Sequence, residues 1–109
     1  MSKEPKVKLI DLTQYRALQI VRGAARDSAQ VFYTAHALQR MRQRRVTPTQ
    51  VMRCLAHGRI SEGPARDVMK GGWKCTLEHY SAGDAIGISV GIETITSGEI
   101  TIITVFNVN

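Results

Sequence analysis

The sequence predicts an α+β protein in which N-terminal helices pack on a C-terminal antiparallel sheet of three to four strands. Two patterns lead to this prediction. Apolar residues recur at helical spacing up to Gly58, and they alternate with polar residues at a period of two from Trp73 onward. A length of 109 residues with a hydrophobic fraction of 43% suits one domain with its own core, and we expect residues 1–109 to form it.

The N-terminal region is predicted to contain a basic tail, a helix and a brief strand. Lysines dominate residues 1–10, which we expect to be a flexible tail. A helix is expected to start near Asp11 or Thr13, either of which can cap it, and to run to about Arg26. The run Val31-Phe32-Tyr33 has the β propensity of a short strand.

Two further helices carry clear start signals. Thr34 can cap a helix from Ala35 to about Arg44. The run Thr47-Pro48-Thr49-Gln50 is a capping box with proline at the first helical position, where no N–H is lost. Gly58 is well placed to end this third helix.

The C-terminal half is predicted to be a meander of three strands, one face of which packs on the helices. Gly87 and Gly91 share the opposite face of the middle strand, where they leave a surface clear for a partner or mark a bend. The residues that share one face within each of these strands are expected to be Trp73, Cys75, Leu77 and His79, then Ile86, Ile88, Val90 and Ile92, and finally Ile100, Ile102, Thr104 and Phe106.

Charge is distributed unevenly along the chain. The formal net charge is +6, but residues 1–59 contain 12 Lys/Arg against 3 Asp/Glu, whereas residues 60–109 contain 3 against 6. A basic helical half is typical of a protein that binds a phosphate backbone or an acidic partner. A surface charge that only promotes solubility is the alternative.

The apolar segments and cysteines indicate a cellular compartment. No apolar run approaches the roughly 20 residues of a membrane span, and no signal peptide is recognisable, so we expect a cytoplasmic protein with no membrane partner. Cys54 and Cys75 are isolated in the sequence, which favours two small buried side chains over a disulfide or a metal site.

The second predicted helix carries the main candidate site. His36, Arg40 and Arg44 are spaced i, i+4 and i+8, so their side chains form one column on the helix surface. Guanidinium groups present donor forks that match phosphate oxygens, and Arg40, Arg42, Arg44 and Arg45 are the candidate RNA- and phosphate-binding set. In the alternative interpretation, the column only ties the helix to the sheet by ion pairs with Glu62, Asp67 or Glu78.

Metal-independent RNA cleavage needs a base, an acid and cations on the phosphate. His36 is the leading catalytic candidate, because Arg40 lies one turn beyond it and would hold a phosphate within its reach. His79 is a second catalytic candidate, but the strand face on which it lies is equally consistent with a position in the core. Glu78 and Tyr80 point the other way and could supply a base and a donor. The histidines lack metal-ligand spacing and no nucleotide loop occurs, so no metal or cofactor is expected.

Several short motifs of the chain occur together in one known family. They are Tyr33-Thr34-Ala35-His36-Ala37, Arg40-Met41, Arg44, Val46-Thr47 and the strand Ile102-Ile103-Thr104-Val105-Phe106. Together they resemble the family called domain of unknown function 4258 over roughly residues 31–106. Its usual pattern has a histidine–alanine pair with arginines four and eight residues after the histidine. Arg45 departs from that pattern, because the family usually has a glycine there, suited to positive φ.

The resemblance implies a compact fold related to the barnase/RelE-like ribonuclease toxins, and frequent pairing with a small zinc-finger antitoxin. We therefore expect a ribonuclease toxin of a toxin–antitoxin pair that cleaves RNA phosphodiesters without metal. Its partners would be RNA and such an antitoxin. The alternative is a non-catalytic module that binds nucleic acid or a protein on a degenerate toxin fold.

Overall fold

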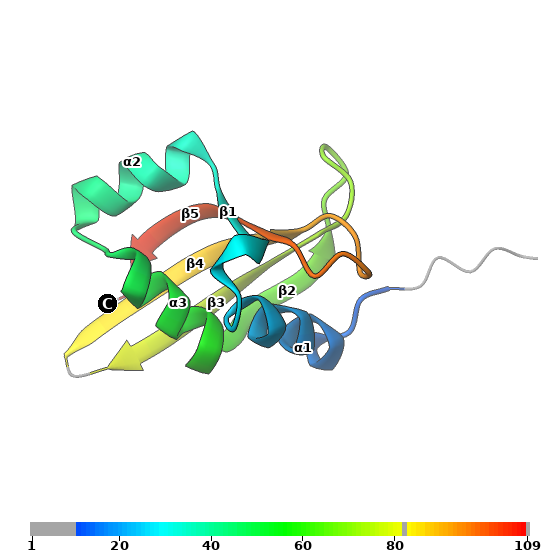
Figure 1. Cartoon of the computed structure of the whole chain (residues 1–109), viewed down its shortest axis with the longest axis horizontal. Helices are drawn as coiled ribbons and strands as arrows, with labels where there is room; N and C mark the ends of the chain where they lie inside the picture. The colour runs from blue at the N-terminus through cyan, green and yellow to red at the C-terminus, as the bar shows by residue number, and fades with distance from the viewer. Residues whose placement is uncertain (1–10, 82, 109) are drawn as a thin grey trace, which may run out of the picture.

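The computed structural model describes residues 11–81 and 83–108. Within them the chain forms three α-helices, one 3-10 turn and a five-stranded sheet (Figure 1). The basic tail expected over residues 1–10 lies outside the described part, and no described helix has the length and apolar character of a membrane span. In chain order the elements are α1 Gln14–Ala24, η1 Ser28–Gln30, β1 Val31–Tyr33, α2 Ala35–Arg44, α3 Pro48–His57, β2 Arg59–Arg66, β3 Trp73–Ser81, β4 Asp84–Ile92 and β5 Ile100–Asn107.

Each α-helix begins at a threonine that the sequence marks as a cap. The backbone N–H three residues on donates to the side chain of each cap, which are Thr13, Thr34 and Thr47. At Thr47 the capping box is complete, because the Gln50 side chain accepts from the Thr47 backbone N–H at 2.8 Å. Helix α1 ends at Ala24 instead of Arg26, a difference typical of helix ends.

The sheet has the strand order β1-β5-β4-β3-β2, and it corrects the predicted three-to-four-stranded antiparallel sheet in two ways. Strand β1 pairs with β5 in parallel, so the sheet is mixed. Strand β2 is an edge strand that the sequence analysis missed, because Gly63-Pro64 interrupts it and its apolar residues do not alternate. Proline and bulges are tolerated at an edge, and the register of β2 against β3 shifts twice.

A bulge in β5 changes which of its residues face the core. Ser89 pairs with Thr104 and Val90 pairs with Ile102, which leaves an extra residue between the two pairs. Beyond this point the alternation is reversed, because one inserted residue moves every later side chain to the other face. Val105 is therefore buried, and the expectation that Thr104 and Phe106 share a face with Ile102 is wrong.

The helices cover one face of the sheet. Helices α1 and α3 lie over it, and α2 lies beside β5 (Figure 1). The core between these layers includes Leu55, Leu77, Ile88, Ile92, Ile100 and Ile102. The opposite face, which we call the open face, has no helix of the described residues packed on it. It presents Arg59, Lys74, Thr76, Glu78, Tyr80, Gly87, Ser89, Gly91, Thr104 and Phe106.

Glycines in β4 allow side chains of β5 to lie across the open face. A Cβ on Gly87 would overlap the ring of Phe106, and a Cβ on Gly91 would lie 3.3 Å from Cδ1 of Ile103. The two glycines therefore make room for side chains of β5. The backbone of β4 is not left uncovered along its whole length.

Burial of the two cysteines generates a prediction about pH. Both thiols are free and buried, and burial raises the pKa of Cys54 to about 12 and that of Cys75 to about 11, from a usual value of 9.0. Because the folded pKa values are raised, the stability that the neutral thiols contribute is complete below pH 9.0 and is lost as pH rises towards 11–12.

We expect the free energy of unfolding, measured with urea, to fall over that alkaline range. Thiol alkylation near pH 8 should be roughly a hundredfold slower in the native protein than in the urea-unfolded chain, because it requires opening of the core. Alkylation of the native protein at the unfolded rate would show that the cysteines are accessible.

Candidate nucleic-acid interface

Thr34 fixes the start of α2 against β5. Its backbone N–H donates to the carbonyl oxygen of Ile102 at 3.1 Å, and its hydroxyl donates to the carbonyl oxygen of Ile103 at 2.9 Å. The same hydroxyl accepts from the backbone N–H of Ala37 at 2.9 Å. Because β1 pairs with β5 only as far as Ile102, α2 lies along the rest of that edge (Figure 1).

The predicted column of His36, Arg40 and Arg44 runs beside β5. The ring nitrogen Nε2 of His36 lies 3.2 Å from Oγ1 of Thr104. Two turns further on, Nη1 of Arg44 donates to Oδ1 of Asn107 at 3.4 Å. Helix and strand therefore run in the same direction here, and the column is held at both of its ends by polar side chains of β5.

The partners of this column are neutral. Arg40 donates to the side-chain oxygen of Gln43 at 3.3 Å, and Arg44 donates to an amide oxygen. Within the two described ranges no salt bridge joins His36, Arg40 or Arg44 to a carboxylate, so the ion pairs of the alternative interpretation do not form there. The two guanidinium charges are therefore available to an anion.

His36 sits at the margin of the open face. Its partner Thr104 pairs with Ser89, and Ser89 pairs with Thr76 in the next strand. Directly paired residues of antiparallel strands project from the same face. Three hydroxyl groups thus form a row across the sheet, and the imidazole of His36 stands at the end of that row.

His79 lies on the other face of the sheet. It pairs with Ile86, which is buried under the helices, and its ring centroid is 6.0 Å from that of His57 at the end of α3. The structure therefore brings His36 and Arg40 to one region and places the second predicted catalytic histidine elsewhere. Its catalytic role stays a prediction that the geometry does not favour.

A second row on the open face contains charged groups. Arg59 pairs with Glu78, and the hydroxyl of Tyr80 donates to Oε1 of Glu78 at 2.9 Å. Hydrogen bonds from Ser61 and Tyr80, followed by the charge of Arg59, lower the pKa of the Glu78 carboxyl. A carboxylate is therefore held ionised on this face at neutral pH.

Several residues of the two rows have no local sequence signal. Arg59 belongs to the edge strand that shows no alternation, and Ser89 is one of several small polar residues of β4. The alternation in β5 predicts Thr104 on the inner face, because it does not reveal the bulge. Only the pairing register reveals that these side chains are neighbours.

The remaining predicted phosphate ligands lie at the end of α2. Arg42 and Arg45 are exposed and line a shallow groove with Leu38 and Pro48. Arg45 has φ 55° and ψ 42°, the left-handed conformation that favours glycine. An arginine there costs roughly 1 kcal/mol of strain, and it places a guanidinium where the resemblance leads one to expect glycine.

Replacement of Arg45 separates strain from binding. Arg45→Gly should raise the free energy of unfolding by roughly 1 kcal/mol, because glycine adopts positive φ without a steric cost. If Arg45 contacts phosphate, the variant should also bind single-stranded RNA severalfold more weakly, with a salt-dependence slope reduced by about one. Arg42→Gly is the control, since a glycine inside α2 should destabilise. Unchanged RNA affinity in Arg45→Gly would remove this residue from the interface.

The hydrogen bonds around Glu78 predict a measurable titration. Ser61→Ala and Tyr80→Phe should each raise the pKa of the Glu78 carboxyl, which can be followed by NMR of its carboxyl carbon. Because the folded pKa is lowered, the stability contributed by Glu78 is present at neutral pH and is lost as pH falls through that pKa. Tyr15→Phe on α1 should leave the titration unchanged. An unaltered Glu78 titration in both variants would contradict the assigned contacts.

Comparison with known proteins gives one match. A family model described as a domain of unknown function, DUF4258, matches residues 33–107, which include α2, α3 and strands β2 to β5. No curated protein and no solved structure matches the chain. The likeness seen in the sequence motifs is confirmed by this match, and the chain belongs to the DUF4258 family.

Proposed function

We propose that this protein binds single-stranded RNA along α2 and the open face and cleaves its phosphodiester backbone without a metal ion. In this proposal it acts as the toxin of a toxin–antitoxin pair, on a fold related to the barnase/RelE-like group. The toxin role and an antitoxin partner with a zinc finger rest on the family resemblance. The RNA-directed chemistry rests on the geometry of the interface.

One observation carries the proposal. Two arginines and a histidine stand in a column beside a polar sheet face, and their contacts within the described residues are all to neutral groups. The like charges of Arg40 and Arg44, four residues apart, repel one another unless an anion lies between them. RNA supplies a row of such anions, and planar guanidinium groups bind phosphate oxygens with two parallel hydrogen bonds.

The chemistry of cleavage assigns roles to this column. The 2′-hydroxyl attacks the adjacent phosphorus, the bond from phosphorus to the 5′-oxygen breaks, and a cyclic phosphate and a 5′-hydroxyl result. His36 is the titratable group beside the arginines, so it would transfer a proton at this phosphate. Arg40 would stabilise the negative charge that develops on the phosphate oxygens. The contact with Thr104 would orient the imidazole.

The second charged row belongs to a neighbouring part of the binding surface. Glu78 lies in β3, two strands from Thr104, which corresponds to roughly 10 Å between the backbones. We therefore assign this row to a part of the binding surface other than the column on α2. Arg59 and Tyr80 would instead contact the next nucleotides, through a charged hydrogen bond and through stacking respectively.

A non-catalytic RNA-binding module is the second candidate. The observation that favours it is the position of His79, which leaves His36 as the histidine that the described structure places at the open face. The interface contains evident phosphate-binding groups. A complete acid–base pair is less evident, because a single imidazole of the described residues lies there. Both candidates predict salt-dependent binding of RNA, so only cleavage separates them.

Cleavage of labelled single-stranded RNA in the presence of a chelator tests the proposal. We expect the wild-type protein to release fragments with a cyclic phosphate end. His36→Ala and Arg40→Ala should each reduce the rate by roughly a hundredfold or more, because proton transfer and charge stabilisation contribute at that scale. In cells, His36→Ala should relieve the growth defect caused by the wild-type chain.

Matched controls come from α3, which packs on the other face of the sheet. His57→Ala and Arg53→Ala remove an imidazole and a guanidinium that lie away from the column, and both should retain the activity. RNA that binds but stays intact would favour the non-catalytic module. Activity that survives His36→Ala but is lost in His79→Ala would place the chemistry on the other side of the sheet and overturn the proposal.

A further inference from the structure

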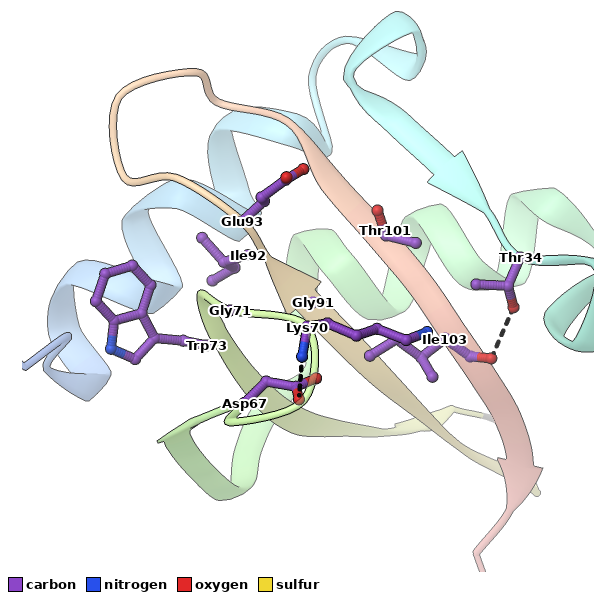
Figure 2. Close-up of a pocket in the computed structure, with 10 residues that line it drawn as sticks. All are labelled: Thr34, Asp67, Lys70, Gly71, Trp73, Gly91, Ile92, Glu93, Thr101 and Ile103. Atoms are coloured by element: carbon purple, nitrogen blue, oxygen red, sulfur yellow. Dashed lines mark hydrogen bonds between the residues drawn. The ribbon is translucent and has the colours of Figure 1, made fainter.

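A pocket of about 220 Å³ opens at the end of the open face near the turn between β2 and β3 (Figure 2). Gly91 lies at its floor, and Thr101 and Ile103 of β5 form one side. Residues 67–71 of the turn form the other side. The volume is below the roughly 300–1,000 Å³ typical of sites for drug-sized ligands, so the pocket suits one small planar group.

The turn that walls this pocket is fixed by its own hydrogen bonds. The carboxylate of Asp67 accepts from the backbone N–H groups of Met69 and Lys70, each at 3.1 Å. Its backbone N–H donates to the carbonyl oxygen of Gly72 at 3.0 Å. Gly72 has φ 73°, and a Cβ there would overlap the carbonyl oxygen of Ile92. The wall is therefore preformed, and the Asp67 carboxylate is already engaged.

Besides Asp67, the pocket is lined by Lys70 and Glu93, which carry opposite charges and form no salt bridge with each other. In Figure 2 the side chain of Lys70 stretches across the hollow towards Ile103, while Glu93 stands on the far side of Gly91. No salt bridge within the described residues involves Lys70 or Glu93. A ligand that presents N–H donors on one edge and acceptors beside them would satisfy both groups.

The pocket lies next to the start of α2. Thr34 lines it and caps the helix two residues before His36. The Thr34 hydroxyl donates to Ile103 and accepts from Ala37, so its proton is not available to a ligand. Its role is to fix the position of the pocket relative to the column. A nucleotide with its phosphate at His36 would therefore have a base within reach of the pocket.

We propose that this pocket binds a guanine base of the RNA, an inference that rests on the proposed function. The apolar side chain of Ile103 lies against Gly91, and together they give a flat ring an apolar surface on which to lie. Among the four bases, guanine alone offers two adjacent N–H donors, which a carboxylate such as Glu93 accepts together. Its O6 and N7 acceptors suit the ammonium of Lys70.

Non-cleavable probes test the pocket separately from catalysis. We would titrate 2′-O-methyl trinucleotides that carry guanine, adenine, cytosine or uracil between two uridines. Trp73 is the one tryptophan of the chain and lines the pocket, so its fluorescence reports binding. The guanine probe should bind roughly tenfold more tightly than the others, because a good bidentate contact discriminates at that scale. Glu93→Gln should abolish the preference, and Glu99→Gln in the β4–β5 loop should keep it.

The outcomes separate this inference from the proposed function. Equal binding of all four probes, no binding, or a preference that survives Glu93→Gln would overturn the guanine pocket, even if RNA is cleaved. A guanine preference that depends on Glu93 and Lys70 would support the pocket, even in a protein that leaves RNA intact. Lys70→Ala should weaken binding of the guanine probe more than binding of the pyrimidine probes. Pyrimidines lack the paired O6 and N7 acceptors that would face the ammonium.

Discussion

The attachment of Thr34 to the backbone of β5 is the constraint on which the interface depends. One residue donates twice to consecutive carbonyl oxygens of the strand and accepts once from the first turn of α2. It thus ends the parallel pairing of β1 and begins a helix at the same point. Without this junction, the cations of α2 would have no fixed relation to the strands that carry the hydroxyl row.

The two faces of the sheet follow from how small and large residues are distributed over its strands. Apolar side chains of β3, β4 and β5 point to α1 and α3 and form the core. On the other side, Gly87 and Gly91 carry no side chains, so Phe106 and Ile103 of β5 can lie across β4. The result is a surface with a row of hydroxyls, the hydrogen-bonded carboxylate of Glu78 and a pocket at one end.

Local rules are broken mainly at the basic end of the molecule. A column of cations lacks anionic neighbours within the described residues, and Arg45 holds a backbone conformation that costs an arginine about 1 kcal/mol. Conflicts between local preference and the global fold concentrate where a protein binds or reacts. The three helices and strands β3 and β4, by contrast, agree with their sequence signals, and this agreement provides stability that offsets the strained positions.

The sequence alone determined the three helices, the brief strand β1, the inner faces of β3 and β4 and the column on α2, because caps and periodicity act within a few residues. It did not reveal β2, whose edge position tolerates an irregular pattern, or the side of the sheet that holds His79 relative to His36. Tertiary structure decided that Thr104 faces His36 and that Glu78 faces Arg59. Both neighbours depend on strand register and on one extra residue in β5, and no local pattern encodes which distant residue lies opposite.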